Sequence, residues 1–257
     1  MRILVIGDVT SPGGLEHLKE NLWRVRKEQG IDFTVVNGEN AAFITGISAE
    51  QAEGLLRHGA DCITGGNHTL RNRSVYTFLD DAREMLRPIN FGDAAPGRGY
   101  TILDCQGYRI MVINAMGTVY IEPTLDSPYN YIDKALAREE GNFDIAILDF
   151  HAEASGEKLG LARSYDGKIS VIFGTHTHVQ TADEQILPLG TGYITDVGMC
   201  GERGGVLGID TEMMIHRLRT RMPEKYKVAG GECVADAVIF DVDVSSKKTV
   251  SVKRIKI

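Results

Sequence analysis

Short apolar runs alternate with amphipathic stretches over the first two thirds of the chain. Six runs rich in β-branched residues predict strands. They cover residues 3–7, 33–36, 62–64, 109–114, 145–150 and 169–173. Strands that alternate with helices form largely parallel sheets covered by helices, so the pattern predicts an α/β fold.

Two amphipathic helices are predicted between the first three strands. The first ends before Gly30, and its apolar face has helical spacing. That face consists of Leu15, Leu18, Leu22 and Val25. The second begins with a capping box of Ser48 and Gln51, and Gly59 is its predicted C-cap. Its apolar face consists of Ala52, Leu55 and Leu56.

The last third of the chain has strand-like runs with little helix between them. These runs cover residues 192–197, 234–244 and 249–257, and they favour a second sheet packed against the first. The basic residues 253–256 are typical of a solvated edge strand. Asp210 can cap one late helix. The residues that share a face of this helix are Ile215, Leu218 and Met222.

Charge and length narrow the class of protein. The 257 residues contain 28 Lys and Arg against 35 Asp and Glu, a net charge of −7. This balance argues against a duplex nucleic acid or an anionic membrane as partner, and is compatible with a small anionic substrate. No linker or repeat interrupts the chain, so we expect one domain over residues 1–257. No apolar run is long enough for a signal peptide or a spanning helix, so a cytoplasmic protein is expected.

Cysteine and glycine patterns do not indicate a separate site. The four cysteines are far apart with no C-x-x-C pair, which favours buried reduced thiols, with Cys200 the one expected to be exposed. The glycine-rich residues 201–208 lack the spacing of a phosphate-binding loop. A flexible loop beside the site is expected there.

Polar side chains follow nearly every predicted strand. They are Asp8, Glu39, Asn40, Asn67, His68, His151, His176 and His178. Carboxyl ends of parallel strands lie at one edge of the sheet, where α/β folds bind ligands. A mixed set of carboxylate, amide and imidazole groups without thiolate suits Mn, Fe, Zn or Co. The number of groups exceeds what one tetrahedral metal uses, which indicates two metals.

These motifs also resemble a known superfamily. "GD" at 7–8, "NGEN" at 37–40, "GNH" at 66–68, the histidine at 151 and "GTHTH" at 174–178 are similar to the motif blocks of calcineurin-like metallophosphoesterases. The longer stretches "VVNGENAA", "DFHAEA", "GTHTHVQTAD" and "YITDVGM" resemble the bacterial YmdB-like branch. The resemblance extends from the first strand past residue 200. It implies a sandwich of two mixed β-sheets flanked by helices.

The resemblance also implies ligand roles. Metal 1 would be held by Asp8, Glu39, Asn40 and His178, and metal 2 by Glu39, Asn67, His151 and His176. The sequence departs from the general pattern at Thr10, where the superfamily has histidine, and at Glu39, where it has a bridging aspartate. In the resembled branch, the residue at Asn40 supplies the missing contact. Fe or Mn is preferred for both sites, with Zn as an alternative.

Two further residues have open roles. His68 follows a predicted ligand, and we expect it to protonate the leaving group; the alternative is a hydrogen bond that orients Asn67. Asp149 fits either an outer partner of the ligands or a buried salt bridge.

The activity implied by the resemblance is hydrolysis of a small phosphodiester by metal-bound hydroxide. The YmdB-like branch implies a 2′,3′-cyclic-nucleotide 2′-phosphodiesterase. A phosphomonoesterase or phosphoprotein phosphatase would use the same metals, and a non-catalytic protein that binds metal or nucleotide is the alternative of another class. The sequence is compatible with a homo-oligomer.

Overall fold

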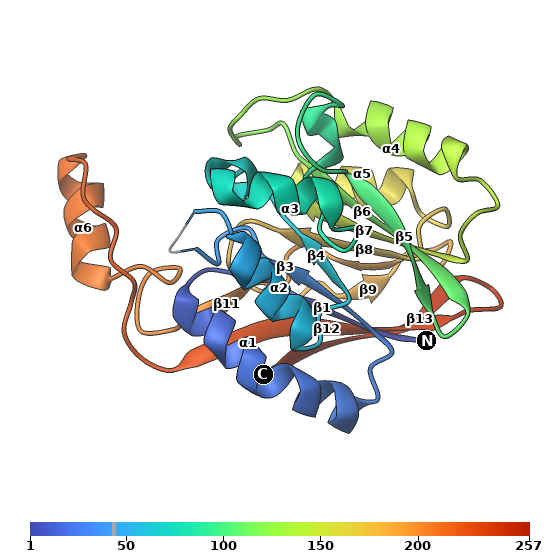
Figure 1. Cartoon of the computed structure of the whole chain (residues 1–257), viewed down its shortest axis with the longest axis horizontal. Coiled ribbons are helices and arrows are strands. Elements are labelled where there is room, and N and C mark those ends of the chain that lie inside the picture. The colour runs from blue at the N-terminus through green and yellow to red at the C-terminus, as the bar shows by residue number, and fades with distance from the viewer. Residues whose placement is uncertain (43–44) are drawn as a thin grey trace.

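The computed structural model describes residues 1–42 and 45–257, which form two facing β-sheets between layers of helices (Figure 1). The first sheet has seven strands in the order β2-β11-β12-β1-β3-β4, with β13 paired to β12. Its strands are β1 (Arg2–Ile6), β2 (Asp8–Val9), β3 (Phe33–Asn37), β4 (Cys62–Thr64), β11 (Met199–Glu202), β12 (Cys233–Asp243) and β13 (Lys248–Lys256).

The second sheet has six strands in the order β5-β6-β7-β8-β10-β9. Its strands are β5 (Tyr100–Cys105), β6 (Tyr108–Met116), β7 (Ile145–His151), β8 (Val171–Thr175), β9 (Gln185–Ile186) and β10 (Gly192–Ile194). Strands β1, β3 and β4 are parallel, as are β6, β7, β8 and β10, whereas β12 runs antiparallel to β1. The predicted class, two mixed sheets flanked by helices, is confirmed.

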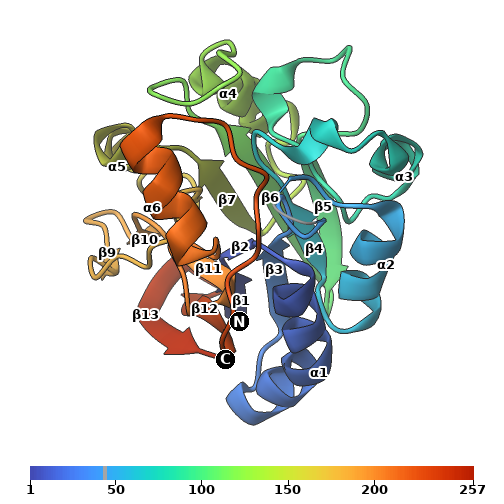
Figure 2. The ribbon, with the colours of Figure 1, turned by 90° about the vertical axis from the view of Figure 1, so that its left-hand side faces the viewer.

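Alternating side chains of each strand build separate parts of the core. Ile3 and Val5 of β1 face the second sheet, whereas Leu4 and Ile6 face the helices α1 (Pro12–Gln29) and α2 (Ala49–Arg57). On the other side, α4 (Pro128–Arg138) and α5 (Ser155–Ser164) cover the second sheet. The four layers are visible end-on in Figure 2, where the short α3 (Tyr76–Asp81) flanks α2.

The predicted helix signals are largely confirmed. The apolar face of α1 is buried and Gly30 follows the helix with φ of 63°. The capping box of α2 is present, but His58 occupies the C-cap and Gly59 follows it with φ of 115°. Gly59 therefore supplies the turn with positive φ at the predicted residue, one position after the C-cap.

The last third of the chain differs from the prediction in its sheet pairing. Strands β11, β12 and β13 join the first sheet, with β12 placed beside β1, and the second sheet is built mainly from the middle of the chain. The expected edge strand is confirmed, since β13 pairs with β12 alone. The prediction that Cys200 is the exposed cysteine is wrong. Cys200 is fully buried in β11, and Cys233 is the partly exposed cysteine.

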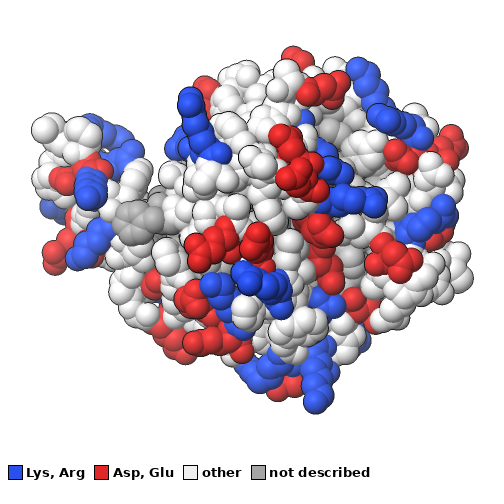
Figure 3. Space-filling view, in the orientation of Figure 1, with Lys and Arg blue, Asp and Glu red and all other residues white. Residues whose placement is uncertain are grey.

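Helix α6 (Thr211–Thr220) is capped by Asp210 as predicted, but its apolar face is not packed. Leu218 is 57% exposed, and Met222 lies beyond the helix end. The helix projects from the body in Figure 1 and carries both basic and acidic side chains in Figure 3. Among the described residues, no helix is both long and apolar enough to cross a membrane.

Leu22 and Leu218 give a matched test of this packing. Leu22 is fully buried in α1, so Leu22→Ala should lower the free energy of unfolding by about 2–5 kcal/mol. Leu218→Ala removes the same atoms from an exposed position and should change it by less than about 0.5 kcal/mol. Urea denaturation of both variants measures the difference. Equal losses of unfolding free energy in the two variants would contradict the exposed position of Leu218 on α6.

Candidate metal centre

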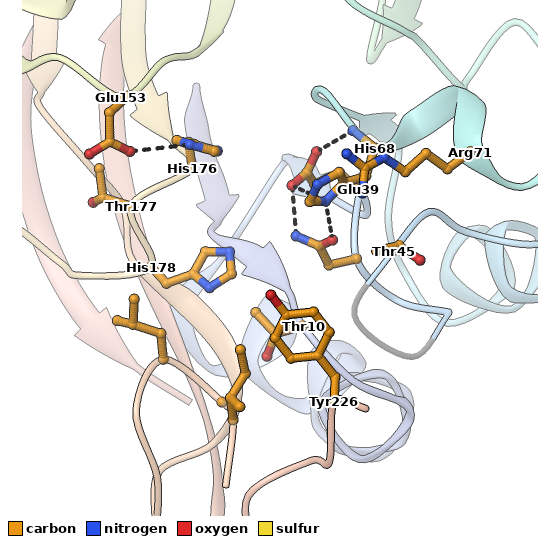
Figure 4. Close-up of a pocket in the computed structure, with 14 residues that line it drawn as sticks. Thr10, Glu39, Thr45, His68, Arg71, Glu153, His176, Thr177, His178 and Tyr226 are labelled. Carbon is orange, nitrogen blue, oxygen red and sulfur yellow. Dashed lines mark hydrogen bonds and ion pairs between the residues drawn. The ribbon is translucent and has the colours of Figure 1, made fainter. Parts of the chain in front are cut away.

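The polar strand ends meet at one edge of the two sheets, beside a pocket of about 360 Å³ (Figure 4). Strands β1, β3 and β4 approach this edge from one sheet, and β7 and β8 from the other. Every predicted site residue lies there. They are Asp8, Glu39, Asn40, Asn67, His68, His151, His176 and His178.

One cluster of ligand atoms surrounds Nε2 of His151. This nitrogen lies 3.3 Å from Oε2 of Glu39. It also lies 3.1 Å from both Oδ1 of Asn67 and Nδ1 of His176. Such separations match the edge of about 3.3 Å of a tetrahedron with metal–ligand bonds of about 2.0 Å. Gly66 keeps the cluster open, because a Cβ at this position would collide with Glu39 and His151.

A second cluster shares Glu39 with the first. Asp8, Glu39 and His178 each offer an atom within 4.8 Å of the others. Oδ2 of Asp8 accepts a hydrogen bond of 3.0 Å from the backbone N–H of His176, but Oδ1 is buried without a hydrogen-bond partner among the described residues. A buried carboxylate oxygen without a partner is costly, and a cation would satisfy it.

The two central imidazoles are held from outside the clusters. Nδ1 of His151 lies 2.9 Å from Oγ1 of Thr175, which donates to Oδ1 of Asp149 over 2.7 Å. Nε2 of His176 lies 3.2 Å from Oε2 of Glu153. Metal-binding histidines are commonly oriented in this way by an outer acceptor. In each ring, the other nitrogen faces the cluster.

Asp149 joins the two sheets beneath the site. Its carboxylate also accepts hydrogen bonds from the side chains of Thr64 and Asn37, which end β4 and β3 in the opposite sheet. Burial raises the pKa of Asp149 to about 7, although these hydrogen bonds favour the ionised form. No cationic side chain pairs with it in residues 1–42 and 45–257. Of the two predicted roles, the structure therefore favours the outer partner over the buried salt bridge.

The loop after β8 depends on a buried ion pair. His176 and His178 have φ of 101° and 62°, a conformation that is unfavourable for side chains with a Cβ. Oδ2 of Asp196 accepts the backbone N–H of Thr177 between them over 3.1 Å. Lys158 is 2.7 Å from the same oxygen, and both side chains are buried. This pair fixes the strained loop that carries the two histidines.

Asn40 lies between Glu39 and His68. Its amide nitrogen donates to Oε1 of Glu39 over 2.6 Å, and its oxygen is 2.7 Å from Nδ1 of His68. The oxygen therefore faces His68 in this arrangement. The backbone N–H of His68 also donates to Oε2 of Glu39 over 3.1 Å. His68 is thus tied to the centre through Glu39 and Asn40, with no hydrogen bond to Asn67 in the described part of the chain.

The electrostatics of the centre favour bound cations. Burial raises the pKa of Asp8, and the charges of Glu39 and Asp196 raise it further. Burial also favours protonation of Glu39, but His151 and His68 outweigh it and lower its pKa. Burial lowers the pKa of each of the three candidate ligand histidines, His151, His176 and His178. Metal binding needs neutral imidazoles and ionised carboxylates. The lowered pKa values supply neutral imidazoles, and a cation would offset the repulsion that raises the pKa of Asp8, so the residues of both clusters fit metal ions.

Several pocket residues carry no signal in the sequence pattern. Most are single side chains on loops; they are Thr45, Arg71, Glu153, Ile209 and Tyr226. The expected loop at 201–208 does border the site, since Leu207 and Gly208 line the pocket. Arg71 could be suspected only from its position four residues after Asn67.

Comparisons with known proteins agree with this architecture. The chain is 42% identical over 257 residues to the 2′,3′-cyclic-nucleotide 2′-phosphodiesterase of Bacillus subtilis, covering all of this chain and 97% of that protein. The structure is similar to a hypothetical protein from Thermus thermophilus (TM-score 0.93, 33% identity, 100% and 99% of the two chains). It is equally similar to a phosphatase from Mycoplasma pneumoniae (TM-score 0.93, 32% identity, 100% and 93%).

A more distant likeness shows the fold alone. The 5′-nucleotidase precursor of Thermus thermophilus matches with a TM-score of 0.58 at 14% identity, covering all of this chain and 54% of that one.

The family model described as YmdB-like protein matches residues 4–255. This match over nearly the whole length and the 42% identity to the Bacillus subtilis protein show that the chain belongs to the family of YmdB-like proteins.

Proposed function

We propose that this chain is a binuclear metal-dependent phosphodiesterase that hydrolyses 2′,3′-cyclic nucleotides. The observation that carries the proposal is the position of Glu39, whose carboxylate belongs to both ligand clusters. One carboxylate can bridge two cations about 3.5–4 Å apart, the arrangement of two-metal phosphoesterase sites. The substrate class follows from the named activity of the Bacillus subtilis relative.

The proposed ligand sets are those that the resemblance to the YmdB-like branch implies. Metal 1 is assigned to Asp8, Glu39, Asn40 and His178, and metal 2 to Glu39, Asn67, His151 and His176. Ligation by the oxygen of Asn40 requires its amide to turn over, because that oxygen now faces His68. The nitrogen and oxygen donors favour Fe or Mn, with Zn as the alternative. Bound ions would activate a water molecule and stabilise charge on the phosphoryl oxygens.

His68 is proposed as the proton donor. It lines the pocket and is partly exposed there, and Nδ1 faces the side-chain amide of Asn40. Once that amide has turned to offer its oxygen to metal 1, its N–H donates to Nδ1, and the ring proton lies on Nε2. This contact leaves Nε2 for the substrate. As the water oxygen bonds to phosphorus and the P–O2′ bond breaks, the proton on Nε2 passes to O2′, giving a 3′-phosphate. Arg71 lines the same pocket and adds a positive charge for the phosphoryl group.

Phosphomonoester hydrolysis is the second candidate, because the similar Mycoplasma pneumoniae structure is described as a phosphatase. Both activities would use the same clusters. Turnover of bis-p-nitrophenyl phosphate against p-nitrophenyl phosphate separates them. The proposal requires the diester to be the better substrate.

Replacement of the shared carboxylate tests the bridge. Glu39→Gln should lower the metal content at both sites together and lower kcat/KM by about 100-fold or more. Replacing a residue that only orients a metal ligand already lowers metal affinity or activity by about 10–100-fold, and Glu39 is proposed as a direct ligand. Elemental analysis after loading with Mn²⁺ gives the content. Glu153→Gln is the matched control: its carboxylate pairs with His176, so any loss of metal should be confined to the second site. Full occupancy and rate in Glu39→Gln would exclude the bridging role.

The proton-donor role of His68 predicts a dependence on the leaving group. His68→Ala should keep its metal content and lose about 10²- to 10⁴-fold in kcat on 2′,3′-cyclic AMP, whose leaving alkoxide is basic. The loss on an aryl phosphodiester should be much smaller, because phenolate leaves without an acid. Equal losses on both substrates would assign His68 to positioning alone.

A further inference from the structure

Residues 206–229 form a projecting hairpin, defined here as α6 with the two segments that join it to the body. The two segments are paired at their base, where Ile209 bridges to Val228 and the backbone N–H of Asp210 donates to the carbonyl of Lys227 over 2.9 Å. Ile209 also bridges to Val206 within the first segment. None of the ten residues of α6 is buried. The helix therefore contributes little to the core, and the paired segments at its base join it to the body.

The base of the hairpin lies in the pocket beside the metal centre. Leu207, Ile209 and Tyr226 line the same pocket as Glu39 and His178. Every large apolar or aromatic side chain that lines this pocket, among the described residues, comes from the hairpin. The pocket thus has a metal-ligand side and an apolar side. Its volume of about 360 Å³ lies in the range of about 300–1,000 Å³ typical of sites that bury a small ligand.

Tyr226 is the aromatic group of the apolar side. Figure 4 shows its ring directed into the pocket, across from Glu153 and His176. The guanidinium carbon of Arg217, on α6, lies 4.8 Å from the ring centroid. Such a cation–π contact covers one face of the ring and restrains it. The ring is only partly buried, so surface remains for a ligand.

We propose that Tyr226, backed by Arg217, is the stacking platform for the nucleobase of the substrate. This inference rests on the proposed function: the phosphoryl group occupies the metal centre, and the nucleoside then extends toward the only apolar wall among the described lining residues. Stacking on an aromatic ring accepts every base, because each base has a π face. The enzyme should therefore tolerate all four bases and favour purines, which offer the larger ring area.

Substrates with and without a base test the platform. For Tyr226→Ala, the rise in KM for 2′,3′-cyclic AMP should exceed the rise for the 2,3-cyclic phosphate of 1-O-methylribose by roughly 5- to 100-fold. The kcat for cyclic AMP should change by less than about 3-fold, since the reacting atoms are not touched. Tyr226→Phe keeps the ring and should restore most of the difference. Tyr120→Ala, at a position 89% exposed and outside the pocket, is the matched control.

The outcomes separate the two levels of the proposal. If Tyr226→Ala raises KM equally for both substrates, or if Tyr226→Phe is as impaired as Tyr226→Ala, the platform is wrong while the phosphodiesterase stands. If the wild-type protein turns over bis-p-nitrophenyl phosphate but no 2′,3′-cyclic nucleotide, the proposed substrate class is wrong and the platform falls with it. Metal content of each variant is measured in parallel, because loss of metal would show that Tyr226 supports the centre instead.

Discussion

A single buried carboxylate, Asp149, holds the two sheets together where their functional ends meet. It accepts hydrogen bonds from Asn37, Thr64 and Thr175, which end three other strands. Thr175 in turn fixes His151. Because partners from both sheets converge on one group, the strand ends are aligned with one another, and the ligand positions follow from that alignment.

Above this junction, negative charge and strain are concentrated in a small buried volume. Asp8 and Glu39 are both buried, and Lys158, the neighbouring buried cation, is already paired with Asp196. His176 adopts a left-handed backbone conformation that Asp196 helps to maintain through the loop. Burial of carboxylates without compensating charge is unfavourable, so the buried site favours the binding of cations. Under the proposed function, the membership of Glu39 in both ligand clusters would let this volume hold two cations.

The sequence predicts the site better than it predicts the arrangement around it. A strand that ends in a polar residue is a local pattern, so the sequence alone could place His151 and the other candidate ligands at one edge of the sheets. The pairing of Arg2 with Asp241 joins distant segments, and no local pattern specifies it. Periodicity likewise shows that α6 is amphipathic, but not whether another surface covers it. Tyr226 and Glu153 are single residues outside any motif, and only the fold brings them to the pocket.

The shared cation site can be tested most directly by crystallography of metal-loaded protein, with anomalous diffraction collected at the absorption edge of the metal. The account predicts two peaks per chain about 3.5–4 Å apart. The carboxylate of Glu39 should bond to both ions, either through one shared oxygen or through one oxygen to each ion. A single peak in fully loaded, active protein, or two peaks of which only one contacts Glu39, would contradict it.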